Sequence, residues 1–410
     1  MITRQRSQEF IILISCLVLF SMCQIKNEKK LNRIQKADKL IDINIDKLEI
    51  EKPILFSSIF KGFKLLPLET KEECLIGNIN QLELSDDTLY ILDSNITKAL
   101  LLFDNAGMFI KKIGHIGKGP GEYSQPTSFT IDNQKKQIQI LDTQQSKVII
   151  FSTQGKFINE IKLNKGNLCP IQIATQNGIT YIDQLFINLG NVDYLLYGIN
   201  NLGEIKSKWL SNKIYCKGFK QPFNMSSIFF KTENDIKYSK SLFDTIFSVK
   251  ENKLSPFLVI STKNKLTAED ISTMNQFKDS RQFVNYYYRI CKKFMGITNY
   301  IETNKLISFR FRSNNRNYNI FYWPENKELH CTSSLIDDLT HQEVISNFYT
   351  TSRNHFISII QNDTPGSMES FIKNIRDNKI LLSEKERSKL VKITPNNNPI
   401  IVVYECNEKF

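Results

Sequence analysis

The sequence predicts an all-β protein, a six-bladed β-propeller of four-stranded antiparallel blades with two helical insertions. Three observations lead to this prediction. Short β-branched and aromatic segments dominate the chain, they recur with a period near 48 residues, and an unpaired strand-like segment precedes the first repeat. That period is the size of one four-stranded propeller blade. Because one blade cannot bury both of its faces alone, the blades are expected to stack around a ring.

Residues 1–22 are expected to be a signal peptide of the lipoprotein type. Arg4 and Arg6 precede the apolar run Phe10–Met22, which is too short to cross a bilayer as a helix. Cys23 follows where a lipobox places the cysteine that takes a diacylglycerol, although the residue before it is larger than usual. Leu13–Cys16 fits the four-residue pattern better but would leave a very short apolar core. Lipidation at Cys23 is the prediction, with lipid-free secretion and an uncleaved anchor as alternatives.

The composition is that of a globular protein and gives no sign of nucleic-acid binding. A hydrophobic share of 41% can build a core, and the formal net charge of +12 is scattered without a run of like charges. No nucleic-acid partner is therefore predicted. Residues 23–55 are assigned to an N-terminal linker and 56–410 to the propeller. The later cysteines are widely spaced without a CxxC pair, so no zinc or redox site and no cofactor is expected, and buried free thiols are predicted.

The repeat is clearest in two segments, residues 89–113 and 138–162. Each reads as a strand, Asp, a polar turn, an apolar strand, a turn with Gly, and another strand. Asp93 and Asp142 are 49 positions apart, and Gly107 and Gly155 are 48 apart. Residues 178–204 form a weaker third copy. Strands of a fourth, fifth and sixth blade are expected in residues 241–260, in residues 305–329, and in the segments NHFISII and NPIIVVYEC.

The remaining segments predict ring closure and the helices. The orphan strand at about 60–69 should complete the last blade beside residues 398–405. Thr267 and Asp270 frame a capping box that opens a helical insertion over 267–294. A second insertion covers 364–391 and begins at Thr364-Pro365, with a further cap at Ser383–Glu386. Both insertions carry apolar residues at helical spacing that are expected to pack on the propeller. They are Phe283, Tyr287, Ile290 and Phe294 in the first insertion, and Met368, Phe371, Ile372 and Ile375 in the second.

The stretch GHIGKGPGEY, residues 114–123, is expected to be a turn between blades. It lacks the Lys-Ser/Thr of a phosphate-binding P-loop, and it leads into a strand rather than the helix of a dinucleotide fingerprint. Such loops gather on one face near the mouth of the central channel. His115, Lys118, Glu122 and Tyr123 are therefore candidate ligand-binding residues. The alternative is that Glu122 and Tyr123 hydrogen-bond the turn itself.

Few other residues are candidates for binding a ligand or for catalysis. Arg310 and Arg312 alternate with phenylalanines, so both guanidinium groups should emerge on one strand face, either to bind an anion or simply to face solvent. The four histidines show no metal-ligand spacing, so no metal site is predicted. Asp93 and Asp142 end equivalent strands and are expected to accept turn N–H groups. No catalytic motif is present, so no catalytic residue is assigned.

Several motifs resemble a known family. They are LPLET at 66–70, LIGNINQLELSDDTLYILD at 75–93, GKGPGEYSQP at 117–126 and NPIIVVYE at 398–405, with DTIF and LIDDL in later blades. The chain resembles the exported six-bladed β-propeller lipoproteins, relatives of NHL-repeat propellers. The resemblance implies a propeller on the cell envelope, facing the periplasm or the cell surface. We expect a lipid-anchored module that binds a small molecule, glycan or protein. The alternative is an envelope lyase or hydrolase with its site at the channel mouth.

Overall fold

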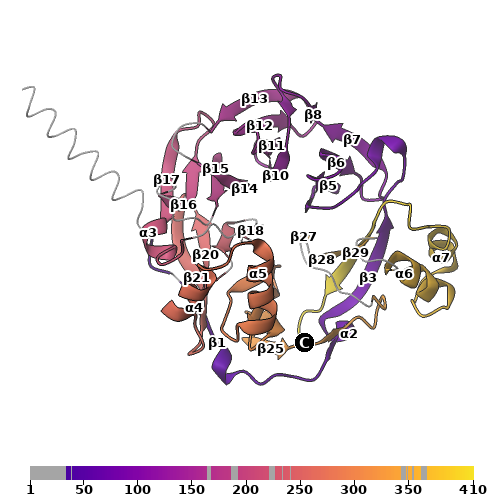
Figure 1. Ribbon diagram of the computed structural model, residues 1–410. Coiled ribbons are helices and arrows are strands. Elements are labelled where there is room, and N and C mark those ends of the chain that lie inside the picture. Colours follow the sequence, from indigo (N-terminus) through magenta and orange to yellow (C-terminus); the bar gives the residue numbers. More distant parts are fainter. Residues whose placement is uncertain are drawn as a thin grey trace, which may run out of the picture.

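The computed structural model describes residues 34–410 except for residues 38, 164–167, 186–192, 221–226, 233, 241, 343–347, 349, 353–354 and 362–366. Six sheets stand around a central axis, as Figure 1 shows in a view along that axis. The predicted six-bladed β-propeller is therefore confirmed. No helix in the described residues is long and apolar enough to cross a membrane. Cys23 and the expected signal peptide lie outside the described residues.

The first three blades follow the repeat that the sequence predicts, four antiparallel strands each. Blade 1 consists of β4 (Gln81–Ser85), β5 (Thr88–Asp93), β6 (Ala99–Phe103) and β7 (Phe109–Ile113). Blade 2 consists of β10 (Pro126–Asp132), β11 (Gln137–Asp142), β12 (Lys147–Ser152) and β13 (Phe157–Lys162). Blade 3 consists of β14 (Pro170–Gln176), β15 (Ile179–Gln184), β16 (Tyr194–Ile199) and β17 (Ile205–Ser211).

The later blades keep the same order with more variation. Blade 4 consists of β18 (Ser227–Lys231), β19 (Ile236–Lys240), β20 (Thr245–Lys250) and β21 (Lys253–Ser261). Blade 5 consists of β22 (Ile297–Glu302), β23 (Ile307–Ser313), β24 (Arg316–Trp323) and β25 (Glu328–Thr332). Blade 6 consists of β27 (Thr350–Ser352), β28 (His355–Ile360), β29 (Ile400–Cys406) and β3 (Phe60–Pro67). Two small sheets pair β8 (His115–Ile116) with β9 (Glu122–Tyr123), and β2 (Ile54–Leu55) with β26 (Leu335–Ile336).

Strands from the two ends of the chain meet in blade 6. The strand β29 pairs antiparallel with β3, with Tyr404 opposite Phe63 and Ile400 opposite Pro67. In Figure 1 the indigo strand β3 lies beside the yellow strand β29. Because β3 precedes the first blade in sequence but completes the last one, it joins the beginning and the end of the ring.

The segment before β3 is more ordered than a linker. The strand β1 (Ile41–Asn44) pairs parallel with β21, so blade 4 has five strands. Further along, β2 pairs parallel with β26. Residues 41–55 therefore run along the outer edges of blades 4 and 5. This pairing was missed in the sequence because a strand edge that accepts β1 exists only after blade 4 has formed.

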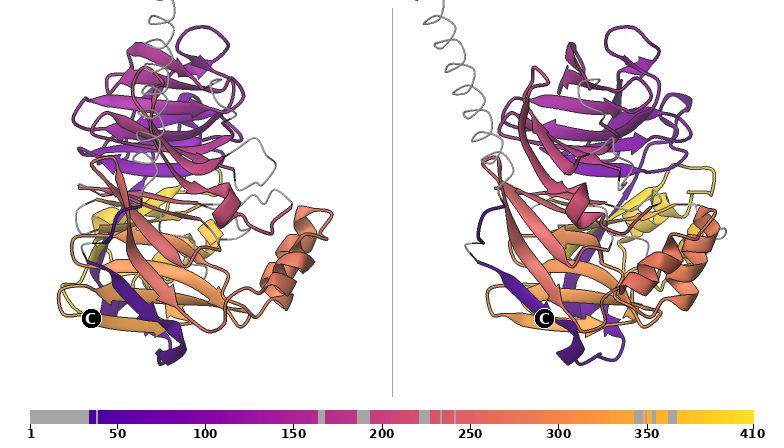
Figure 2. Two further views of the ribbon diagram at one scale, coloured as in Figure 1. Left: turned by 90° about the vertical axis from the view of Figure 1, so that its left-hand side faces the viewer. Right: turned by 60° about the vertical axis from the view of Figure 1, so that its left-hand side comes forward.

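Helices are present in both of the segments in which the sequence predicts insertions, between β21 and β22 and between β28 and β29. Helix α4 (Ala268–Met274) begins with the expected capping box, in which Thr267 and Asp270 each accept the backbone N–H of the other. It is followed by α5 (Ser280–Asn285) and a π-helical turn, Tyr286–Ile290. Figure 2 shows α4 and α5 projecting from one face of the propeller. The helical run ends at Ile290, which is 57% exposed, so the expectation that this whole stripe packs on the propeller is wrong at that residue.

The second insertion carries α6 (Ser367–Arg376) and α7 (Glu384–Leu390). The predicted stripe of α6 is buried against blade 6, with Met368, Phe371, Ile372 and Ile375 in one hydrophobic cluster. The predicted cap at Ser383 and Glu386 is present as a capping box. The predicted start at Thr364-Pro365 lies outside the described residues.

Most of the core lies between neighbouring blades. The layer between blades 1 and 2, for example, contains Tyr90, Leu92, Phe129 and Ile140. The six described cysteines are free thiols; five are buried as predicted, whereas Cys169 is exposed.

One ion pair is buried between blades 3 and 4. The Lys240 Nζ atom lies 2.8 Å from Asp183 Oδ1, and neither side chain is exposed. The Tyr238 hydroxyl also donates a hydrogen bond of 2.7 Å to this carboxylate. Burial raises the pKa of Tyr238 well above its ordinary value, so the hydroxyl keeps its proton and remains a donor.

Candidate binding face

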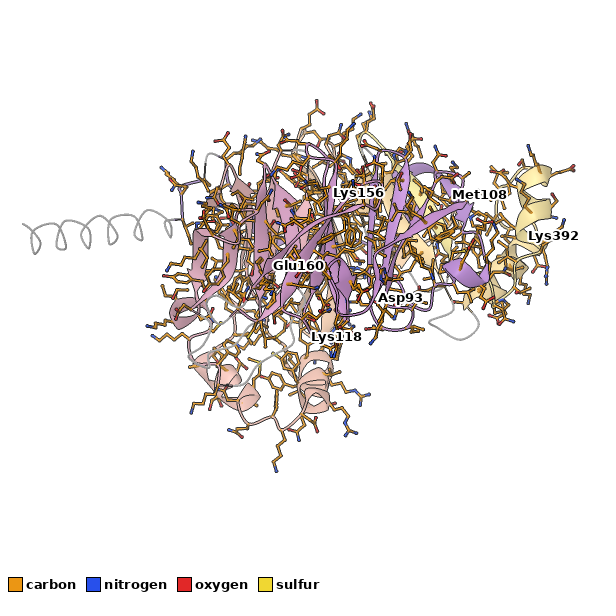
Figure 3. The ribbon with its side chains drawn as sticks, turned by 90° about the horizontal axis from the view of Figure 1, so that it is seen from above. Asp93, Met108, Lys118, Lys156, Glu160 and Lys392 are labelled. Carbon is orange, nitrogen blue, oxygen red and sulfur yellow. The ribbon has the colours of Figure 1, made fainter. Side chains whose placement is uncertain are left out.

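The two faces of the propeller differ in their connections. Because the four strands of a blade alternate in direction, the connections that follow the second and fourth strands emerge on the same face. We call this the loop face; it carries the long connections 114–125, 262–296 and 361–399. The opposite face has tight hairpin turns such as Asp86–Asp87 and Glu251–Asn252, whose positive φ angles reverse the chain sharply. In Figure 3, Lys118 lies toward the side of α4 and α5, and Lys156 toward the other side.

The loop 114–125 is held together by Glu122. Its Oε2 accepts the Gly119 N–H at 2.7 Å, and its Oε1 lies 2.9 Å from His115 Nε2. The Gly119 N–H and then His115 hold the pKa of this carboxyl below its usual value. A Cβ atom on Gly117 would lie 1.9 Å from Glu122 Oε2, so a side chain larger than hydrogen would displace the carboxylate. Glu122 therefore fixes the turn, as the second reading of the sequence proposed.

Tyr123 has a similar internal role. Its side chain is buried, and its hydroxyl donates a hydrogen bond of 3.0 Å to the Ile113 carbonyl. Burial raises the pKa of Tyr123 to about 12. Two members of the predicted set, the imidazole of His115 and the side chain of Lys118, are exposed to solvent. The Glu122 side chain is partly exposed, at 29%, and Tyr123 is the one member of the set that is fully enclosed.

Asp93 and Asp142 hold the loop face together, as the sequence suggests. Asp93 is fully buried and accepts the backbone N–H groups of residues 77 and 78 before the blade and of residues 95 and 96 in its inner loop. Although burial alone raises its pKa, these N–H groups hold the pKa of Asp93 below its ordinary value. Asp142 accepts N–H groups of residues 124, 125, 144 and 145 in the same way. In blade 3, Gln184 is the equivalent residue and accepts the Cys169 N–H at 2.6 Å.

The two arginines do not form an open anion site. Arg312 is 5% exposed and donates to the backbone carbonyls of Tyr287, Tyr288 and Asn315, and to Asn317. It therefore ties the helical insertion to blade 5 rather than facing solvent. Arg310 donates from Nε to Asn319 Oδ1 at 2.7 Å, and burial lowers its pKa. Arg312 is thus used internally, a result that neither reading of the sequence predicted.

The central channel is crossed by a lysine that the sequence analysis did not single out. Lys231, on the inner strand of blade 4, lies 3.7 Å from Glu83 of blade 1 and also donates to the Ile131 carbonyl of blade 2. Blades 1 and 4 stand on opposite sides of the ring (Figure 1). Burial raises the pKa of the Glu83 carboxyl, and the positive charge of Lys231 offsets part of that rise. No local pattern could have revealed this pair, because its members belong to inner strands that meet only when the ring closes.

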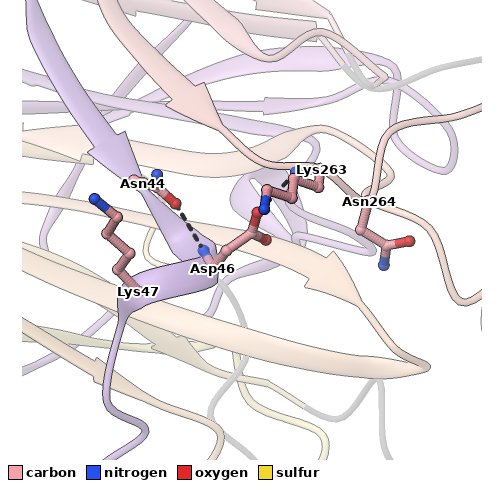
Figure 4. Close-up of a pocket in the computed structure, with 5 residues that line it drawn as sticks. All are labelled: Asn44, Asp46, Lys47, Lys263 and Asn264. Carbon is pink, nitrogen blue, oxygen red and sulfur yellow. Dashed lines mark hydrogen bonds between the residues drawn. The ribbon is translucent and has the colours of Figure 1, made fainter.

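One pocket lies where the N-terminal segment crosses the connection from blade 4 to blade 5. Its volume is about 440 Å³, and Figure 4 shows its lining residues, Asn44, Asp46, Lys47, Lys263 and Asn264. The Asp46 carboxylate accepts hydrogen bonds from Thr262 Oγ1 and the Lys263 N–H, both at 2.7 Å. The bond from Thr262, followed by that from the Lys263 N–H, holds the pKa of Asp46 below its ordinary value.

Within the described residues, no group of three His, Cys, Asp or Glu side chains could hold a metal ion.

Comparison with known proteins identifies the family. The family described as Domain of unknown function (DUF4934) matches residues 39–405. The chain belongs to this family. No curated protein matches the DUF4934 chain significantly.

Two solved structures are similar to this chain at low sequence identity. A protein of Bacteroides fragilis, provisionally named as exported, is 19% identical with a TM-score of 0.71, over 90% of this chain and 100% of that chain. A DUF4221 family member from Bacteroides vulgatus is 10% identical with a TM-score of 0.48, over 85% of this chain and 97% of that chain. The likeness to the Bacteroides fragilis protein, at 19% identity, shows the fold alone.

Proposed function

We propose that this chain is an exported, lipid-anchored β-propeller that binds a ligand or a partner protein on its loop face. The observation that carries the proposal is the difference between the two faces. Tight hairpin turns suffice to build the blades, as the opposite face shows. Long ordered connections cost conformational entropy, and on rigid scaffolds such connections commonly carry function.

Exposed apolar side chains on the loop face support binding of a partner. Ile96 is 66% exposed and Ile116 is 59% exposed, on neighbouring connections of blade 1. Lys118, on the same loop as Ile116, is exposed as well. The two isoleucines give this face apolar surface that a bound partner can cover. The partner classes are a small molecule, a glycan or a protein.

Export and anchoring are supported by the N-terminal sequence. The apolar run ends at Cys23, and the structurally similar protein of Bacteroides fragilis is provisionally named as exported. The membrane partner in this proposal is a bilayer that receives the acyl chains of Cys23. The module would then be held at the cell envelope, facing the periplasm or the cell surface.

Mass spectrometry of the N-terminal peptide tests the anchor. The full chain, expressed in a bacterial host that processes lipoproteins, should carry a diacylglyceryl group and partition into the membrane fraction. Cys23→Ser should abolish the lipid mass and release the protein, whereas the matched variant Cys16→Ser should keep both. A lipid-free mature chain, or a lipid that survives Cys23→Ser, would refute the anchoring.

Thermal unfolding of residues 34–410 tests the binding face, since all six described blades lie within this range. A panel of glycans, peptides and nucleotides is added at high concentration. A ligand present at about 100 times its Kd stabilises the folded state by about 2.7 kcal/mol. Lys118→Ala should reduce the rise in Tm, and Lys156→Ala on the opposite face should leave it unchanged. An equal rise in both variants would exclude the loop 114–125 as the site.

A further inference from the structure

The helical insertion between blades 4 and 5 has an unused apolar surface. Its inner side packs on the propeller, where Met274, Tyr286 and Cys291 are buried. Val284, Tyr288 and Ile290 instead remain 50%, 52% and 57% exposed. Tyr288 also packs one side of its ring against Tyr287 and the Arg312 guanidinium, at 4.8 and 4.9 Å. About half of each of the three side chains is nevertheless left open to a partner.

Exposed cations lie close to these apolar residues along the chain. Lys278, Arg281, Arg289 and Lys292 are all exposed, and none pairs with a carboxylate among the described residues. The one acidic residue in this part of the insertion is Asp279, whose carboxylate caps α5 by accepting the Gln282 N–H at 2.9 Å. We call Val284, Tyr288, Ile290 and the four cations the hairpin surface. It combines exposed apolar groups with unpaired positive charge.

The hairpin surface is held in place from behind. Arg312 donates to the carbonyls of Tyr287 and Tyr288. Asn315 Nδ2 donates to the Arg289 carbonyl at 3.2 Å, and Asn264 Nδ2 donates to the Lys292 carbonyl at 2.7 Å. A surface that is already ordered loses little conformational entropy when it binds.

The N-terminal segment reaches the same sector of the ring. Ile34 forms a bridge with Leu254 of β21, and β1 runs alongside the same strand. The strand β21 then leads directly into the insertion, and Figure 1 shows β1, α4 and α5 in one quadrant. The 9 residues of β21 span about 30 Å. Ile34 lies at the start of β21, beside the Glu251–Asn252 turn, and the insertion begins at the other end of this strand. The chain between Cys23 and Ile34 can span at most about 40 Å, so it is long enough to pass along β21 to the face that carries the insertion.

We propose that the hairpin surface docks on a membrane that contains anionic lipids. Val284, Tyr288 and Ile290 enter the headgroup region, and the four cations contact lipid phosphates. Apolar and tyrosine side chains flanked by Lys and Arg are the composition that interfacial segments use, with the long cationic side chains reaching back to the phosphates. The argument from the tether rests on the proposed anchoring at Cys23. The exposed residues and their charges do not depend on it.

Vesicle cosedimentation of residues 34–410 tests the docking without any acyl chain. The protein should sediment with vesicles of phosphatidylcholine and phosphatidylglycerol at 7:3, and at least about tenfold less with phosphatidylcholine alone or when the salt concentration is raised. Arg281→Glu/Arg289→Glu and Val284→Ser/Tyr288→Ser should each weaken the binding at least about tenfold. The matched controls Lys112→Glu/Lys156→Glu and Met108→Ser/Leu202→Ser, at exposed positions outside the insertion, should bind as the parent does.

Two outcomes would overturn the proposal. The first is a parent chain that does not sediment with the anionic vesicles, which would leave an acidic protein as the partner of this surface. The second is equal loss of binding in the hairpin variants and their controls. Circular dichroism of each variant excludes unfolding as the cause. Absence of lipid on Cys23 in the full chain would refute the anchoring alone, because this assay does not use the anchor.

Discussion

Replacing Lys240 by methionine should leave the Asp183 carboxylate buried without the ammonium group that lies 2.8 Å away. Methionine keeps most of the side-chain stem, so the packing between blades 3 and 4 changes little while the charge is removed. The Tyr238 hydroxyl still donates to the carboxylate, but a neutral hydrogen bond is weaker than one from an ammonium ion. The perturbation therefore isolates the electrostatic contribution of the pair.

The size of the effect follows from burial. Both side chains have no exposed surface, and removing one partner of a buried ion pair costs about 3–5 kcal/mol. The exposed pair Lys206–Glu204, with side chains 44% and 57% exposed, provides the control. Lys206→Met should cost less than about 1 kcal/mol, because solvent screens that interaction. Lys240→Met should therefore lower the free energy of unfolding several times more than Lys206→Met does.

Urea unfolding of residues 34–410 at neutral pH, followed by the fluorescence of buried Trp209 and Trp323, measures both free energies. The double variant Asp183→Leu/Lys240→Met should cost at least about 2 kcal/mol less than the sum of its single variants, because neither charge is left alone. A Lys240→Met cost similar to that of Lys206→Met would refute the reasoning, as would strict additivity in the double variant.

Three further outcomes are expected. Gly117→Ala should lower the stability of the chain in urea, because its Cβ displaces the Glu122 carboxylate that accepts the Gly119 N–H; a neutral effect would contradict that role. The pKa of Glu122 is lowered by the Gly119 N–H and by His115, so its stabilisation is complete above its unfolded value of about 4.3 and is lost as the pH falls through the lower folded value. Glu122→Gln should therefore lose less free energy of unfolding than the parent between about pH 5 and 3 in urea titrations. If the free energy of unfolding falls with pH equally in both proteins, Glu122 does not contribute this stability. A thiol reagent should label Cys169 rapidly in folded residues 34–410 and the five buried cysteines only after denaturation, and rapid labelling of Cys169→Ser would exclude this assignment.

Local features were predicted well from the sequence. The spacing of Gly107 and Gly155 matches equivalent turns in which both residues have positive φ angles, 82° and 84°. The capping box at Thr267 and Asp270 needs only residues three positions apart. Such signals are visible in a linear sequence because the interacting groups are close along the chain.

The candidate site was predicted less well, and Glu122 shows why. Its sequence neighbours placed it on an exposed loop, but the direction of its carboxylate depends on the Gly119 N–H and on His115 across the turn. Arg312 could equally have faced solvent until the helical insertion folded over it. The sequence located these side chains but did not reveal whether they face a ligand or the protein.

The sequence alone determined the period, the number of blades, the helical insertions and the loop between blades 1 and 2, because each depends on short-range patterns of side chains. Only the tertiary structure decided that Lys231 meets Glu83 across the channel, that Asp183 pairs with Lys240 between blades, and that residues 41–44 extend blade 4. These contacts join groups whose positions are fixed only when six sheets close into a ring. The free energy of burying their charges and pairing their strand edges then depends on neighbours that are distant in the sequence.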